Sequence, residues 1–155
     1  MAKYIQRQRE SDQDSDIAQY LKSRYGNACR FEKRHADAFT EVGLPDINLS
    51  VYGMSIQIED KIRGEFPRDN QIKRLLEYDT SGAISFWVDS FEMFIEKWEE
   101  LVEGDPRFRF MKSEWEKRDS IENLKNRNIA LAFIEYKEKQ VNIRDEQLLK
   151  YKKRS

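Results

Sequence analysis

The chain has 155 residues, 28 of them basic and 29 acidic, so its formal net charge of −1 does not by itself indicate a nucleic-acid-binding protein. Its length is that of one domain, and 39% hydrophobic and 12% aromatic residues suffice for a packed core. A single cysteine, Cys29, excludes an intramolecular disulfide and four-cysteine metal sites, and a lone thiol suits a reducing cytoplasm.

The N-terminal residues lack the apolar run of a signal peptide, and no apolar stretch is long enough to cross a bilayer. We therefore expect a cytoplasmic protein with no membrane contact. An acidic segment, residues 10–16, precedes an apolar stripe at helical spacing, formed by Ile17, Tyr20 and Leu21. Carboxylates favour a helix N-terminus and Gly26 is suited to end the helix, so the first elements are a predicted helix and then a strand over residues 28–33.

The most informative segment is a predicted β-hairpin after a turn at residues 43–45. Apolar and polar residues alternate over 46–51 and over 54–61, which is the period of half-buried strands. Tyr52-Gly53 suits a two-residue loop, because glycine accepts the positive φ required there. Apolar residues then face each other in one register only: Val51 with Met54, Leu49 with Ile56, and Ile47 with Ile58.

The same register predicts a cluster of charged side chains. It sets Asp46 opposite Glu59, with Cβ atoms ~4.5–5.5 Å apart, and keeps Lys61 on their face. Opposed carboxylates destabilise a sheet unless a cation such as Mg²⁺ or Mn²⁺ neutralises them, and the carbonyl of Asp60 is a further candidate ligand. Such an ion would stabilise charge on a phosphate, while Lys61 could orient or deprotonate the attacking water or stabilise the transition state.

A second predicted helix begins at Pro67. Its inner stripe is expected to be Ile72, Leu75 and Leu76, with Gln71 on a different face. Residues 61–74 hold five basic and two acidic side chains, and phosphate binding requires a locally positive surface. The residues expected to contact nucleic acid are Arg63, Arg68, Lys73 and Arg74.

A short buried strand is predicted over residues 83–88, and another helix follows it. Asp89 is suited to cap this helix, with Glu92 as its capping-box partner. Its apolar stripe continues to Val102, and the helix is expected to stop at Gly104.

The remaining residues, 105–155, are expected to form a charged C-terminal extension that packs on the core or projects from it. Phe108 and Phe110 alternate with arginines, which favours an edge strand. Residues 129–136 fit either a strand or a buried helix, and the last fifteen residues fit an exposed helix. We expect residues 1–104 to be the core domain.

The motif Gly43-Leu44-Pro45-Asp46-Ile47 with Ile58-Glu59-Asp60-Lys61 resembles that of the PD-(D/E)xK nuclease superfamily. The predicted order also resembles that superfamily's restriction-endonuclease-like αβββαβ core, an α/β fold with a mixed sheet flanked by helices. With Gln71 and Gly82-Ala83, the pattern is similar to virus-type replication–repair (VRR-NUC) and Holliday-junction-resolvase-like small nucleases over residues 10–102.

The resemblance implies Asp46 and Glu59 as ligands of Mg²⁺ or Mn²⁺, Lys61 as the catalytic lysine, and Gln71 near the scissile phosphate or the attacking water. Such families often add an acid from the first helix, and here either Glu10 or Asp14 fits. Asp60 departs from the pattern, whose middle position is usually apolar. It faces the core side, so we expect it at a frayed strand end or paired with a base.

The implied function is a Mg²⁺-dependent endodeoxyribonuclease that hydrolyses branched or flapped DNA in phage-type replication, recombination or repair. The alternative is a catalytically inactive module of the same fold that binds nucleic acid or serves protein assembly. A homodimer would suit a junction resolvase because it supplies two symmetric cuts, and residues 105–155 offer a surface for a protein partner.

Overall fold

The computed structural model describes residues 2–35, 42–118 and 129–154. They belong to two compact units, Met1–Glu116 and Lys117–Ser155. The elements, in chain order, are α1 (Ala2–Tyr25), the 3₁₀ turn η1 (Gly26–Ala28), β1 (Cys29–Lys33), β2 (Ile47–Val51), β3 (Met54–Asp60), α2 (Asp69–Thr80), β4 (Ile84–Val88), α3 (Phe91–Lys97), the π-helical turn η2 (Trp98–Glu103), α4 (Pro106–Glu116) and α6 (Ile129–Arg154).

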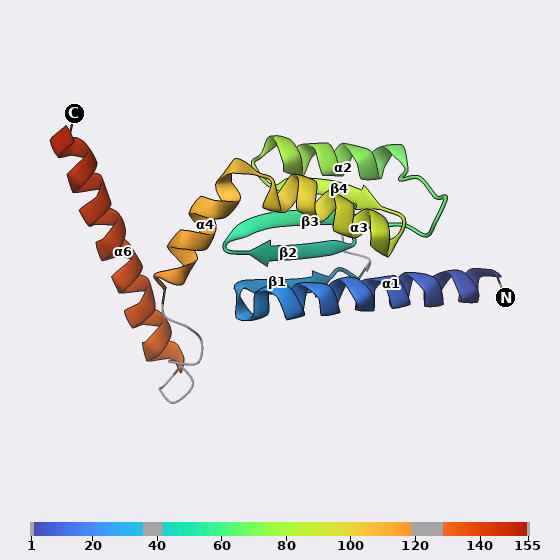
Figure 1. Ribbon diagram of the computed structural model, residues 1–155, viewed down its shortest axis with the longest axis horizontal. Helices are drawn as coiled ribbons and strands as arrows, with labels where there is room; N and C mark the ends of the chain where they lie inside the picture. Colours follow the sequence, from blue (N-terminus) through green and yellow to red (C-terminus); the bar gives the residue numbers. More distant parts are fainter. Residues whose placement is uncertain (1, 36–41, 119–128, 155) are drawn as a thin grey trace. The chain divides into compact units, whose positions relative to one another are not determined.

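The first unit is built on one four-stranded mixed sheet with the order β1-β2-β3-β4 (Figure 1). β1, β2 and β3 pair antiparallel, whereas β3 and β4 pair parallel through the crossover helix α2. The predicted restriction-endonuclease-like αβββαβ order and mixed α/β sheet are therefore confirmed. The parallel pair brings the C-terminal end of β3 beside that of β4, where α2 and α3 begin.

The hairpin has the register that apolar matching predicts. Ile47 pairs with Ile58, Leu49 with Ile56 and Val51 with Met54. Both loop residues have positive φ, 51° at Tyr52 and 83° at Gly53, which is the backbone of a tight two-residue hairpin. A slip by one residue would move every apolar side chain of these strands to the opposite face.

The two faces of the sheet differ in chemistry. One face is apolar and packs against α1, α3 and η2, through fully buried side chains that include Ile17, Leu21, Phe94, Trp98 and Val102. The other face is polar and lies under α2, which contributes one buried residue, Leu75. The predicted stripe of α2 is wrong at Ile72 and Leu76, which are exposed. Because α2 covers polar strand residues, it buries only Leu75 against the sheet.

The helix α3 begins with a different cap from the predicted one. The Oγ of Ser90 accepts a hydrogen bond from the Met93 N–H at 3.1 Å, so Ser90 and not Asp89 is the N-cap. The carboxylate of Asp89 instead accepts from the Gly64 N–H at 3.4 Å. β4 ends at Val88, so Asp89 lies one residue before the N-cap position of α3. Its side chain faces the segment that joins β3 to α2.

Residues 106–116 form the helix α4, so the predicted edge strand at Phe108 and Phe110 is wrong. Phe108, Met111 and Trp115 recur at helical spacing and pack against the core. The ring of Phe108 lies 5.4 Å from that of Tyr52 in an edge-to-face arrangement. The first compact unit therefore continues past residue 104, where the core was expected to end.

In the second unit, residues 129–136 belong to the helix α6, so they form a helix and not a strand. The same helix includes the helical segment that was predicted near the C-terminus. The helix is exposed and not buried: Leu131, Phe133 and Ile134 are more than half exposed. Among the described residues, no helix combines the length and apolar character needed to span a membrane.

Candidate active site

Asp46 is fixed at the entrance to β2 by two main-chain contacts. Its carbonyl accepts a hydrogen bond from the Arg34 N–H at 2.7 Å, and its Oδ2 accepts from the Asp60 N–H at 3.1 Å. Pro45, directly before it, is buried. The carboxylate is thereby held beside the C-terminal end of β3, as the hairpin register requires.

Glu59 is the buried acid of the cluster, with 1% of its surface exposed. It lies on the α2 face, close enough to Asp46 for the two carboxyl groups to interact electrostatically. Burial and then the charge of Asp46 raise the pKa of Glu59 to about 7, although Lys61 opposes both effects. Near neutral pH this pair therefore accommodates either a proton or another positive charge.

Lys61 and Gln71 both reach the same oxygen of Glu59. The Lys61 Nζ lies 3.3 Å from Glu59 Oε1, and the Gln71 Nε2 donates to that atom at 2.7 Å. The Oε1 of Gln71 accepts from the Arg68 N–H at 2.8 Å, which fixes the amide at the first turn of α2. The structure thus brings Asp46, Glu59, Lys61 and Gln71 into one cluster.

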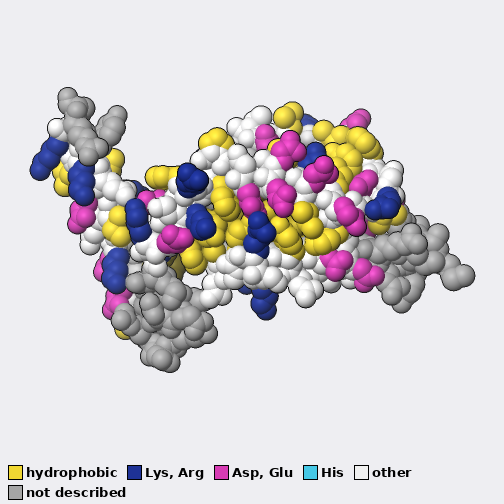
Figure 2. Space-filling model, in the orientation of Figure 1, with side chains coloured by type: hydrophobic (Ala, Val, Ile, Leu, Met, Phe, Trp, Pro, Cys, Tyr) yellow, Lys and Arg dark blue, Asp and Glu magenta, His cyan; other side chains and the backbone are white. Residues whose placement is uncertain are grey.

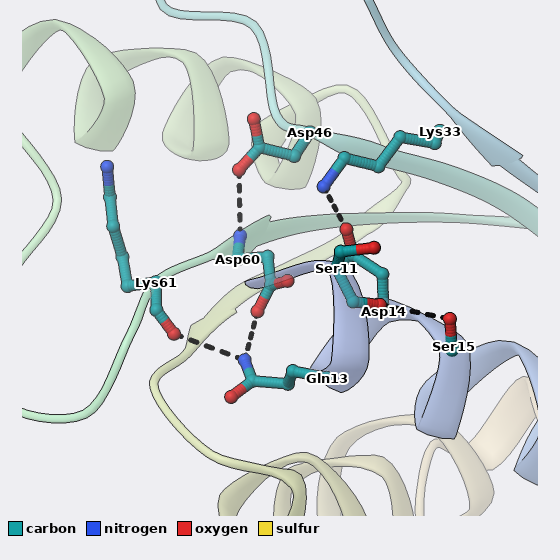
Figure 3. A network of polar contacts seen from close by, with 8 residues as sticks. All are labelled: Ser11, Gln13, Asp14, Ser15, Lys33, Asp46, Asp60 and Lys61. Atoms are coloured by element: carbon teal, nitrogen blue, oxygen red, sulfur yellow. Dashed lines mark hydrogen bonds and ion pairs between the residues drawn. The ribbon is translucent and has the colours of Figure 1, made fainter. Parts of the chain in front are cut away.

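A second polar network lies on the α1 side of the same sheet end (Figure 3). Asp60 is buried there and accepts a hydrogen bond from the side-chain amide of Gln13, which also donates to the Lys61 carbonyl at 3.1 Å. Burial, then a hydrogen bond with Asp14, raises the pKa of Asp60 to about 9. Asp60 is therefore at an ordered strand end, and its direct partners are an amide and another carboxyl, not the expected base.

The two candidate acids of α1 have different surroundings. Asp14 forms an ion pair with Lys33 and contacts Asp60 on the α1 side (Figure 3). The pKa of Glu10 is raised by burial and then by the negative charge of Asp46, so Glu10 lies within electrostatic reach of the cluster.

The cluster offers oxygen ligands to a hard cation. The Oε2 of Glu59 is buried and has no hydrogen-bond partner among the described residues, and the carboxyl of Asp46 interacts with the same group. Within residues 2–35, 42–118 and 129–154, no group of three or more His, Cys, Asp or Glu side chains is placed to hold a metal. Two carboxylates suit Mg²⁺, which usually keeps several waters and is held by one or two carboxylates together with substrate phosphates.

The residues expected to bind nucleic acid are spread over the segment 61–68 and α2. Arg63 is exposed and pairs loosely with Glu92 at 3.6 Å, and the side chains of Arg68 and Lys73 are exposed as well. The Arg74 side chain instead donates hydrogen bonds within the protein, to the Glu77 carboxylate at 2.7 Å and to the Val42 carbonyl at 3.3 Å.

Sequence reasoning missed a polar arrangement around Gln57 on the α2 face. Arg34 donates to Gln57 Oε1 at 2.7 Å and to the Pro45 carbonyl at 2.9 Å, and its guanidinium lies over the Tyr78 ring, 5.6 Å from the centroid. Gln57 also donates to Asn48 Oδ1 at 2.6 Å. The one available signal was the register itself, which sets Asn48 opposite Gln57; the role of Arg34 depends on tertiary docking.

No family model matches the sequence, and no curated protein matches it. Among solved structures, a "VRR_NUC domain protein" aligns with a TM-score of 0.48 and 12% identity, over 61% of this chain and 88% of that one. A second structure, "VRR_NUC domain", aligns with a TM-score of 0.45 and 21% identity, over 56% of this chain and 95% of that one.

Proposed function

We propose that this protein is a divalent-metal-dependent nuclease that hydrolyses phosphodiester bonds of DNA. The observation that carries the proposal is the buried acid Glu59 next to Asp46, with Lys61 and Gln71 converging on one Glu59 oxygen. A structural ion pair needs one acid and one base. A second acid close to the first raises the cost of ionisation, and that cost is recovered when a cation binds.

In this proposal Asp46 and Glu59 hold Mg²⁺ or Mn²⁺. A bound ion would supply neutralisation of the phosphate charge and acidity to a water molecule. The buried Glu59 Oε2, which lacks a partner in the described part of the chain, is the ligand atom that gains most from the cation.

Lys61 and Gln71 act on the reacting groups. The Lys61 ammonium is 15% exposed and stands at the edge of the cluster, where it can donate to a phosphate oxygen or orient water. Gln71 fixes the Glu59 carboxylate and presents its amide on the same side. In the hydrolysis, the water oxygen bonds to phosphorus, the ester P–O bond breaks, and a proton lost by the water is balanced by one that the departing oxygen takes from solvent to become a hydroxyl group.

The charge distribution favours DNA contact on the α2 side. Acidic side chains gather over α3 and η2 on the face shown in Figure 2. These two elements carry the exposed residues Glu92, Glu96, Glu99 and Glu100. Phosphates are repelled by such a surface. The basic segment 61–68 and α2 flank the Asp46–Glu59 cluster instead. Within DNA, branched or flapped molecules are the substrate class that the resemblance of the motif favours.

The test is cleavage of end-labelled duplex, flap and four-way DNA with Mg²⁺ or Mn²⁺. Wild type is expected to cut, and Lys61→Ala to lose about 10²- to 10⁴-fold in rate. Lys22→Ala, which removes an exposed lysine of α1, is the matched control and should cut like wild type. Equal rates for wild type and Lys61→Ala would contradict the proposal, and metal-independent DNA binding without cleavage would favour the inactive binding module.

A further inference from the structure

An exposed aromatic pair lies beside the candidate active site. The Phe66 side chain is 72% exposed, and its ring centroid is 4.7 Å from that of Trp87 at an interplanar angle of 51°. Trp87 is half-buried, so the pair presents an aromatic surface to solvent over an anchored indole.

The β3–β4 register sets this pair next to Glu59. Glu59 and Trp87 are Cα partners in the parallel ladder, so their side chains leave the same face of the sheet. Adjacent strands lie ~4.8 Å apart. A group stacked on Trp87 and Phe66 is therefore the immediate neighbour of a group bound at Glu59 and Lys61.

The segment that carries Phe66 is held in place at several points. The Lys61 N–H donates to the Val88 carbonyl at 2.8 Å, and the Glu65 N–H donates to the Ile62 carbonyl at 3.0 Å. Pro67 is buried, and the next residue is fixed to Gln71. The aromatic surface is thus positioned relative to the cluster before any ligand arrives, which lowers the entropic cost of binding.

Charge around the pair selects the kind of ligand. Arg63 and Arg68 flank Phe66 in sequence with exposed side chains, and the ion pair of Arg63 with Glu92 is fully solvated and weak. One acid, Glu65, also lies in the segment. An exposed aromatic face in a segment that carries arginines matches a nucleotide, whose base stacks and whose phosphate binds arginine.

We propose that Phe66 and Trp87 form a stacking platform for an unpaired nucleobase adjacent to the phosphodiester that is cut. The inference rests on the proposed nuclease function and adds its substrate feature. Bases inside a continuous duplex are already stacked on both sides and cannot reach Phe66. The enzyme therefore prefers DNA that offers an unpaired nucleotide at the cut position.

The experiment measures DNA binding by the full chain with Ca²⁺ in place of Mg²⁺. Fluorescein-labelled single-stranded, flap and continuous duplex oligonucleotides are compared for wild type, Phe66→Ala, Phe66→Tyr and Phe66→Leu. Loss of one base–aromatic stack is expected to weaken single-strand and flap binding by about 5- to 100-fold in Phe66→Ala and Phe66→Leu. Phe66→Tyr keeps an aromatic face and should bind like wild type, as should the control Leu76→Ala, which removes an exposed residue of α2.

A base-analogue readout tests stacking directly. 2-Aminopurine at the unpaired position should be quenched on binding wild type and Phe66→Tyr, and should remain bright with Phe66→Ala. Equal loss of duplex and single-strand affinity, or full affinity in Phe66→Leu, would overturn the platform. Absence of nucleic-acid binding by wild type would also overturn the platform, and would favour a protein as the ligand of the aromatic pair.

The two proposals fail separately. If wild type cuts DNA in a Lys61-dependent manner but Phe66→Ala binds every substrate normally, the platform is wrong and the nuclease stands. If no DNA is cut but single-strand binding depends on Phe66, the nuclease is wrong and the platform stands.

Discussion

The carboxyl group of Glu59 lies close enough to that of Asp46 for the two to interact electrostatically, although both groups are acids and Glu59 is almost completely buried. Two carboxylates close together cannot both stay ionised without a compensating charge. A proton and a divalent cation therefore compete for this pair. The competition has measurable consequences for stability and for metal binding.

Glu59→Gln tests the cost of the buried charge. Without metal, the folded-state pKa of Glu59 is about 7, above its ordinary 4.5, so the folded protein binds this proton more tightly than the unfolded chain. Its contribution to stability is present at low pH and is lost as pH rises from 4.5 through 7. We expect the free energy of unfolding of Glu59→Gln to fall less than that of wild type across this window, in urea titrations with EDTA. Identical pH slopes would contradict this assignment.

Asp60→Asn probes the network on the α1 side. Its pKa of about 9 means that Asp60 holds its proton at neutral pH, and stability should decline as pH rises from 3.8 through 9. Asparagine imitates the protonated acid and removes this decline. The N–H of residue 60 that donates to Asp46 is kept, so DNA cleavage should be retained. Thermal melts from pH 4 to 9 measure the effect, and a variant that still follows the wild-type profile would refute it.

Gln71→Ala removes the hydrogen bond that orients Glu59. Groups that orient a metal ligand typically contribute about 10- to 100-fold to metal affinity or activity, and a net hydrogen bond contributes about 1 kcal/mol to stability. We expect kcat to fall by that factor, with little change in KM for DNA. Ile72→Ala, on an exposed part of the same helix, serves as the control and should keep full activity. If Gln71→Ala raises KM alone, Gln71 contacts substrate and does not position Glu59.

Deletion of residues 117–155 tests whether the first compact unit is sufficient. Phe108, Met111 and Trp115 of α4 pack against the core, whereas Lys117–Ser155 forms its own unit. A chain that ends at Glu116 should melt cooperatively and retain cleavage of DNA. A chain that ends at Gly104 should be destabilised, because it lacks the three packed side chains of α4. Loss of cleavage from the longer chain as well would assign the C-terminal unit a part in the reaction.

The hairpin could be predicted from sequence because two independent signals agree on it. Strand period and loop chemistry at Tyr52-Gly53 both select one register, and that register fixes the position of Glu59 relative to Asp46. Such local patterns need no knowledge of how helices dock. The placement of Gln71 followed in part, because a helix was expected directly after Pro67.

The parts that sequence reasoning missed depend on tertiary packing. The contacts of Gln13 with Asp60 and of Lys33 with Asp14 arise only when α1 docks on the sheet, and no spacing within α1 encodes them. Helical periodicity predicted that Ile72 faces the core. Because α2 covers a polar face of the sheet, Ile72 is exposed instead. Around Phe108, a short alternation of arginine and phenylalanine fits the period of a strand as well as that of a helix. The segment is a helix, in which Phe108 packs against Tyr52.

Calorimetric titration of the full chain with Mn²⁺ and Ca²⁺ tests the Asp46–Glu59 site most directly. Near neutral pH, wild type should bind one divalent cation and release protons, because the ion displaces the proton held by Glu59. Asp46→Asn and Glu59→Gln should lose this binding, whereas Asp16→Asn, which alters an exposed acid of α1, should bind like wild type. Undiminished binding in both site variants, or no binding by wild type, would contradict the account.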